Sequence, residues 1–123
     1  MPSPGKVLLV DDDQEHILMC TTILEKNGYE VKGVTTCNDL KELLDIVTNF
    51  RPGLIFMDHR MTGISGLHAT RLLKGNLTTK HIPVIYFSAE DNVAELAEKA
   101  GADAFLRKPR DLDKLGTVAS IYL

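Results

Sequence analysis

The stretch Leu54-Ile55-Phe56-Met57-Asp58 is an unbroken apolar run that ends in a carboxylate. A second run of the same kind, Val7-Leu8-Leu9-Val10, leads into Asp11-Asp12-Asp13. Continuous apolar runs of this length are typical of strands that are buried on both faces of a parallel sheet. If the two strands are neighbours, at least three carboxylates meet at one edge of that sheet. Like charges held together resist ionisation, and a divalent cation makes such a cluster tolerable and suited to phosphate chemistry.

The composition is that of one globular domain. The chain has 123 residues, of which 44% are hydrophobic and 25% charged, with a net charge of −3. This charge gives no electrostatic drive toward nucleic acid or an anionic membrane. The apolar runs are too short for a membrane span or for the core of a signal peptide. We therefore expect residues 1–123 to form a single domain with a loose lead-in at residues 1–5, without nucleic-acid or membrane contact.

Cys20 and Cys37 have no closely spaced cysteine partner. Two isolated cysteines are more typical of a reduced protein than of a disulfide framework. The sequence therefore predicts free thiols and a cytoplasmic location.

Strand and helix patterns alternate along the chain. The expected strands lie at residues 7–10, 30–35, 54–57, 82–87 and 104–106, and apolar residues at helical spacing mark helices around 17–24, 40–47, 66–74, 93–100 and 112–122. The second strand is more polar than the others, which favours a place at the sheet edge. Such alternation predicts an α/β fold, a doubly wound five-stranded parallel sheet with helices on both faces. In these sheets ligands bind at the carboxyl ends of the strands, where the acidic residues, Ser88 and Lys108 all fall.

Four segments in this order resemble the receiver domain of two-component response regulators. The segments are Val7–Asp13, Leu54–Asp58, Ile82–Ala89 and Gly101–Pro109. The resemblance covers roughly Lys6 to Tyr122. It implies a flavodoxin-like, chemotaxis-regulator-like sheet in the order 2-1-3-4-5, which agrees with the reading of the second strand as an edge.

The resemblance also implies the chemistry of the acidic cluster. Asp58 would be the phosphoacceptor and would form an aspartyl phosphate. Asp11 and Asp12, together with Asp58 and the backbone carbonyl of Arg60, would hold Mg²⁺, with Mn²⁺ as an alternative. Lys108 would pair with Asp58 and then with a phosphoryl oxygen. Phosphoryl transfer needs a nucleophile in line and positive charge around the transferred group, and this set supplies both.

Four further features follow from the same resemblance. The Ser88 hydroxyl would hydrogen-bond the phosphoryl group, assisted by the backbone N–H of Ala89. Ser88 would then move inward and Phe105 would fill the vacated space, so that both act as switch residues. The Lys108–Pro109 peptide bond would be cis. Because water removes an acyl phosphate, the mark would be temporary.

The implied role is a signalling domain rather than an enzyme, although it would assist its own phosphorylation and dephosphorylation. Its partner would be a sensor histidine kinase or a phosphotransfer protein. Phosphorylation would favour a homodimer through the fourth helix, the last strand and the fifth helix. The side chains expected on that face are Glu95, Glu98, Lys99, Arg107 and Lys114. The sequence leaves open whether the domain stands alone or belongs to a larger regulator or hybrid kinase.

Two other functions compete with this one. Val7–Asp13 also fits the strand and D-x-D start of a haloacid-dehalogenase-type phosphatase, with Asp11 as nucleophile and Asp13 as acid/base. That family usually has Thr or Val where this chain has Glu15, and the chain is short for its fold. A receiver-like module that is never phosphorylated is the other alternative, and the intact set of acidic, hydroxyl and lysine residues argues against it.

Several residues near the predicted site also have simpler interpretations. Asp13 fits a helix N-terminal charge, Ser88 fits a helix cap, and Phe105 fits a core residue. His59 is expected to be exposed. Arg60 and Glu90 are expected to form an ion pair across the site that slows the access of water.

The chain departs from the receiver pattern at two positions. Thr62 stands where proline is usual, so the loop after Asp58 is expected to be less rigid. Phe105 replaces the frequent tyrosine and has no hydroxyl to hydrogen-bond. Neither position belongs to the acidic, hydroxyl and lysine set.

Overall fold

The computed structural model describes residues 5–61 and 63–123, and the chain alternates strands with helices throughout. In order, the elements are β1 (Lys6–Val10), α1 (Gln14–Lys26), β2 (Glu30–Val34), α2 (Leu40–Phe50), β3 (Leu54–Met57), α3 (Gly66–Gly75), β4 (Val84–Ser88), α4 (Val93–Ala100), β5 (Ala104–Arg107), the 3₁₀ turn η1 (Leu112–Lys114) and α5 (Leu115–Tyr122). Residues 1–4 of the predicted lead-in and the Thr62 position lie outside the described residues.

The five strands form one sheet in the order β2-β1-β3-β4-β5, and every neighbouring pair is parallel. The predicted fold class and strand order are confirmed, and so is the edge position of the polar strand β2. The register pairs Val10 with Met57. Because these are the last residues of β1 and β3, Asp11 and Asp58 leave the sheet at the same level.

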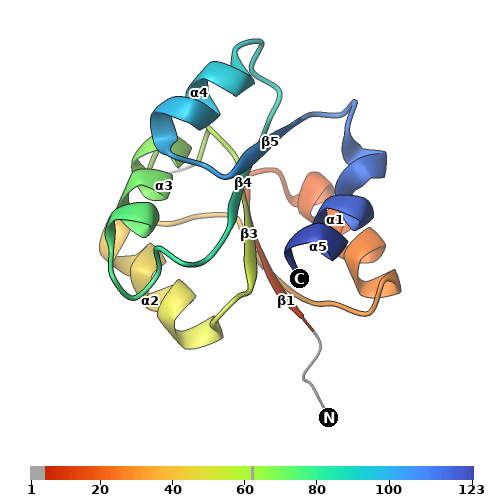
Figure 1. The fold of residues 1–123 in the computed structure, drawn as a ribbon, viewed down its shortest axis with the longest axis horizontal. Helices are drawn as coiled ribbons and strands as arrows, with labels where there is room; N and C mark the ends of the chain where they lie inside the picture. Colours follow the sequence, from red (N-terminus) through yellow and green to blue (C-terminus); the bar gives the residue numbers. More distant parts are fainter. Residues whose placement is uncertain (1–4, 62) are drawn as a thin grey trace.

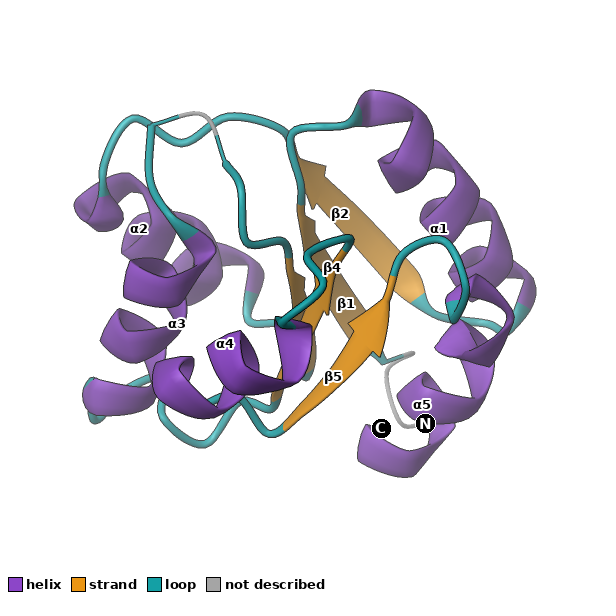
Figure 2. Cartoon of the chain, turned by 90° about the horizontal axis from the view of Figure 1, so that it is seen from above, coloured by secondary structure: helices purple, strands orange, loops and turns teal. Residues whose placement is uncertain are grey.

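Two hydrophobic layers hold the helices against the sheet. Figures 1 and 2 show α2, α3 and α4 on one face and α1 with α5 on the other. Alternate residues of each central strand enter opposite layers, as Leu8 and Leu9 do. The apolar runs are therefore continuous because both faces of the strands are covered.

Short polar side chains begin the first two helices. Asp13 accepts hydrogen bonds from the backbone N–H groups of Glu15 and His16 and so caps α1. Asp39 accepts from the Glu42 N–H and caps α2, while the Glu42 carboxylate accepts from the Asn38 N–H. These contacts satisfy helix N–H groups that have no partner within the helix. The simpler interpretation of Asp13 is thus confirmed.

Several element boundaries differ from the predicted ones by one to three residues, and two of the differences concern how an element begins. Strand β4 begins at Val84 and not at residue 82, because the Ile82 N–H bonds to the carbonyl of Thr79 in the preceding turn. Pro83 has no N–H, but its carbonyl accepts from the Ile55 N–H of β3. The last helical segment starts as the 3₁₀ turn η1 before it becomes the α-helix.

The two ends of the described fold lie together near the amino-terminal ends of the strands, whereas the acidic residues lie at the carboxyl ends. A methyl group added to Gly5, just before β1, would lie 3.2 Å from the Leu123 side chain. No helix among the described residues is both long enough and apolar enough to cross a membrane.

Candidate functional site

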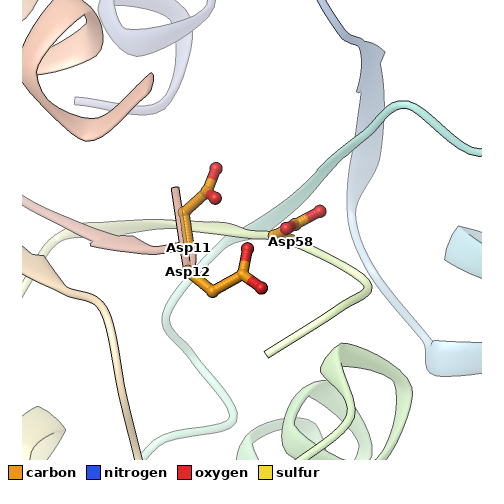
Figure 3. Close-up of side chains that lie close together, drawn as sticks. All are labelled: Asp11, Asp12 and Asp58. Carbon is orange, nitrogen blue, oxygen red and sulfur yellow. The ribbon is translucent and has the colours of Figure 1, made fainter. Parts of the chain in front are cut away.

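The ends of β1 and β3 bring three carboxylates together. Asp11, Asp12 and Asp58 can each offer an oxygen such that all three oxygens lie within 4.8 Å of one another (Figure 3). Asp11 and Asp58 are buried and Asp12 is exposed. The predicted acidic cluster therefore exists, with the all-oxygen donor set that hard divalent cations prefer.

Lys108, which follows β5, reaches into this cluster from the other side. Its ammonium lies 2.5 Å from Asp11 Oδ2 and 3.4 Å from Asp58 Oδ2. Its backbone N–H donates to the carbonyl of Ser88, which fixes the residue beside β4. The Lys108–Pro109 bond is cis, as expected.

The environment of Asp58 opposes its ionisation. Burial raises the pKa of this carboxyl to about 6, and the charge of Asp11 adds to the rise. Lys108 and the backbone N–H of His59, which donates to Asp58 Oδ1 at 2.8 Å, act in the opposite direction. Any additional positive charge in the pocket would stabilise the ionised form of this carboxyl.

Asp11 has the opposite balance. Burial alone would raise its pKa, but hydrogen bonds from His16, Lys108 and the Asp13 N–H outweigh burial and lower the pKa. His16 Nδ1 lies 2.8 Å from Asp11 Oδ2. The four histidines of the sequence have no metal-binding spacing, so the pattern alone indicated no role for His16.

A depression opens above the cluster to solvent. Its lining consists of Asp12, Asp58, Arg60, Ser88, Ala89, Glu90 and Lys108. Ser88 is buried at the end of β4, and its hydroxyl oxygen accepts from the Glu90 N–H at 3.2 Å. Helix α4 begins only after Asn92, so Ser88 does not cap it. The hydroxyl instead stays at the floor of the depression.

Arg60 and Glu90 face each other across the mouth. Arg60 Nε lies 2.8 Å from Glu90 Oε1, which confirms the predicted ion pair. The Arg60 side chain is 79% exposed, so the pair lies at the surface and not in the protein interior.

Phe105 is separate from this cluster. Its side chain is 39% exposed on β5, and the Arg107 guanidinium lies 5.0 Å from the centre of its ring. The interpretation of Phe105 as a core residue is therefore wrong for this conformation. The surrounding face presents Glu95, Glu98, Lys99 and Lys114 as exposed residues and Arg107 as half-buried.

The expectation that His59 is exposed is wrong. His59 is half-buried, and its Nδ1 lies 2.7 Å from the hydroxyl of Tyr86. Tyr86 lies on β4 and is fully buried, so its hydroxyl needs a partner within the protein. The sequence signal was available in Tyr86, whose hydroxyl needs a hydrogen-bond partner when its strand is buried.

Close backbone contact positions the loop after Asp58. A methyl group added to Gly66, the first residue of α3, would lie 2.0 Å from the Asp58 carbonyl oxygen. The Gly66 N–H donates to the His59 carbonyl at 2.8 Å. Only glycine allows α3 to start this close to the acceptor strand.

Comparison with known proteins agrees with this geometry. Residues 7–120 match the response regulator receiver domain family. The polar-differentiation response regulator DivK of Brucella anthropi is 32% identical over 122 residues, which are 98% of this chain and 97% of DivK. The CAI-1 autoinducer sensor kinase/phosphatase CqsS of Vibrio cholerae is 34% identical over 113 residues, which are 89% of this chain and 16% of CqsS.

Solved structures agree at the level of the fold. The receiver domain of the Francisella response regulator 1452 superposes with a TM-score of 0.81 at 30% identity, over 96% of this chain and 95% of that one. These matches do not favour the phosphatase interpretation with Asp11 as nucleophile.

Proposed function

The chain belongs to the response regulator receiver domain family of two-component signalling, and on that premise we propose that Asp58 accepts a phosphoryl group from the phosphohistidine of a sensor histidine kinase or a phosphotransfer protein. One observation carries this proposal. A buried carboxylate with a raised pKa, Asp58, lies 3.4 Å from the Lys108 ammonium, in a depression that is open to a donor.

The reaction is a transfer between two nucleophiles. An Asp58 carboxylate oxygen forms a bond to phosphorus as the phosphorus–nitrogen bond of the donor histidine breaks, and the electron pair of that bond returns to the imidazole. The Lys108 ammonium attracts the phosphoryl oxygens, while the Ser88 hydroxyl and the Ala89 N–H donate hydrogen bonds to them. Water later attacks the phosphorus, which releases phosphate and restores the Asp58 carboxylate.

The residues present fit a divalent cation. Three carboxylates and one ammonium leave a formal charge of −3 + 1 = −2 in the pocket, which one such ion balances. Asp11, Asp12, Asp58 and the backbone carbonyl of Arg60 would hold Mg²⁺ or Mn²⁺. The bound ion would supply positive charge to the transferring phosphoryl group. Removing the ion with a chelator should therefore stop phosphorylation.

The readout is assigned to Ser88 and Phe105. Movement of the Ser88 hydroxyl toward the phosphoryl group would open space on the β5 side. The exposed ring of Phe105 would turn into that space, away from Arg107. The face formed by α4, β5 and α5 would thereby change shape and favour a homodimer.

We further place this activity in the cytoplasm, in a single domain spanning residues 1–123 that signals rather than turns over a substrate. Sedimentation with and without beryllofluoride, a phosphoryl mimic, tests the dimer. A monomer under both conditions would remove it.

Treatment with acetyl phosphate in magnesium buffer tests the central proposal. Intact mass and peptide mapping should show one phosphoryl adduct on Asp58, absent from Asp58→Asn and absent after chelation. An adduct on Asp11 would revive the phosphatase interpretation. No adduct on the wild-type chain would reject the acceptor role.

A further inference from the structure

His16 is held firmly beside the acidic cluster although nothing in the acceptor chemistry calls for it. The residue lies in the first turn of α1 and is 7% exposed. Its ring meets Phe87 edge-on, at 4.9 Å between ring centres and 67° between planes. Cys20 Sγ lies 3.7 Å and 3.8 Å from the two ring nitrogens. The sulfur therefore packs against the ring and is not aligned with either nitrogen lone pair.

This arrangement is not a cysteine–histidine–aspartate catalytic set. Burial raises the pKa of the Cys20 thiol to about 12, so the nucleophilic thiolate is absent at neutral pH. The cavity beside Asp11, His16 and Cys20 is only about 10 Å³, at the lower limit for one water. No substrate fits there. Cys20 and Phe87 fix the orientation of the His16 ring.

The fixed ring of His16 donates one hydrogen bond, and its acceptor is Asp11. An ionised carboxylate only accepts hydrogen bonds, so the contact between His16 Nδ1 and Asp11 Oδ2 requires the proton on Nδ1. Asp11 Oδ2 also accepts from Lys108, and Asp11 Oδ1 accepts from the Asp13 N–H at 2.9 Å. Among the described residues, the donors to this buried carboxylate are therefore His16, Lys108 and the Asp13 N–H.

Phosphorylation would remove one of these hydrogen bonds to Asp11, the one from Lys108. The proposed function requires Lys108 to turn from Asp11 toward phosphoryl oxygens on Asp58. A buried carboxylate oxygen that loses its partner is costly, because desolvation is no longer offset. His16 contacts the same oxygen, Asp11 Oδ2, from α1 and would keep this contact when Lys108 turns away.

We propose that His16 is a positioning residue, which keeps the Asp11 carboxylate oriented toward the cation site while Lys108 moves between Asp11 and the phosphoryl group. The inference rests on the proposed function and adds a residue to it. His16 touches neither the reacting atoms nor the cation, and acts through Asp11 alone. Partners of metal ligands of this kind typically change metal affinity by about 10–100-fold when removed.

Two substitutions at one position test this role. His16→Phe keeps a ring against Phe87 and Cys20 but removes the donor, whereas His16→Asn places an amide N–H where Nδ1 was. Magnesium affinity, measured by NMR titration of the Asp12 and Asp58 amides, should fall about tenfold or more in His16→Phe. His16→Asn should retain most of the wild-type affinity. His81→Phe, at an exposed histidine before β4, is the matched control and should bind as the wild type does.

Equal affinity in the wild type and His16→Phe would overturn the inference, as would an equal loss in both His16 variants. If circular dichroism shows that His16→Phe does not fold, the role of His16 is tested on the wild-type chain by NMR. Long-range ¹H–¹⁵N spectra should show the proton on His16 Nδ1 before and after loading with magnesium and beryllofluoride. A deprotonated Nδ1 in the loaded state would overturn the role. A wild-type chain that binds neither reagent would instead refute the proposed function.

Discussion

Lys108 lies nearer to Asp11 than to the proposed acceptor Asp58, at 2.5 Å against 3.4 Å from the closest carboxylate oxygens. The difference has an electrostatic consequence. The pKa of Asp11 is lowered despite burial, with Lys108 among its partners, whereas burial raises that of Asp58 to about 6. The negative charge of Asp58 is thus less well balanced by nearby donors and positive charge than that of Asp11. A cation or another positive charge in the pocket therefore stabilises the ionised form of Asp58 most.

Replacing Lys108 with methionine should slow phosphorylation of Asp58 by acetyl phosphate about 10²–10³-fold, because the only ammonium in contact with the cluster among the described residues is lost. Time courses of adduct formation by mass spectrometry measure this effect. Lys114→Met is the control, since the largely exposed Lys114 side chain pairs with Asp111 and not with the acidic cluster. Equal rates in Lys108→Met and the wild type would contradict the assigned role.

Asp58→Asn should stabilise the metal-free protein at pH 7.5, by on the order of 1–3 kcal/mol. The native pKa of about 6 lies above the ordinary value of 3.8, so the native state binds more protons than the unfolded state between these values. The Asp58 contribution to stability therefore falls as pH rises from about 4 to about 6 and stays low above that range.

Urea unfolding of both proteins across this pH range measures the difference. The difference in the free energy of unfolding between Asp58→Asn and the wild type should shrink as the pH falls from about 6 to about 4. The pKa of Asp11 is lowered from 3.8, so its own contribution to stability is lost mainly below about pH 4, outside this range. A gap that does not depend on pH would contradict the raised pKa.

Arg60→Ala should accelerate loss of the phosphoryl group several-fold, because the ion pair with Glu90 covers the mouth through which water reaches Asp58. Stability should change by less than about 0.5 kcal/mol, since the Arg60 side chain is largely exposed. Dephosphorylation after removal of the donor gives the rate. Glu90→Gln should have a similar effect, and the double variant should add little if the pair acts as a unit. An unchanged rate in Arg60→Ala would remove this gating role.

Gly66→Ala should destabilise the protein by about 1–3 kcal/mol and impair phosphorylation, because the added methyl group would lie 2.0 Å from the Asp58 carbonyl oxygen. Gly75→Ala is a matched control at the other end of α3, where an added methyl group meets nothing within 4 Å. That change should be neutral or stabilising by up to about 1 kcal/mol. Thermal unfolding and adduct formation measured on both variants separate the two effects, and similar behaviour of the two would refute the close-contact argument.

The sequence predicted the sheet because its signals are local and repeated. Each apolar run, such as Leu54–Met57, is continuous only when helices cover both faces of the strand. The polar residues of β2 marked an edge. Since parallel strands end at the same side, residues directly after them, Asp11 and Asp58, had to meet there. This part of the site follows from strand direction alone.

What the sequence did not predict depends on contacts between elements. His16 and His59 are single histidines without a metal-binding spacing, and their burial follows from partners on other segments, Asp11 and Tyr86. The late start of β4 depends on a hydrogen bond from Ile82 to the preceding turn. A periodicity argument sees none of these partners, because it compares only residues within one element.

Because Gly5 and Leu123 are adjacent, the domain is suited to circular permutation. Both ends leave the fold at the amino-terminal edge of the sheet, a full strand length away from Asp58. A short glycine–serine bridge between them would make a circular chain, and new ends opened between the exposed residues Leu77 and Thr78, after α3, would lie at that same remote end of the sheet. Such a permuted protein should still receive phosphate, because the strand ends that form the acidic pocket are left uncut.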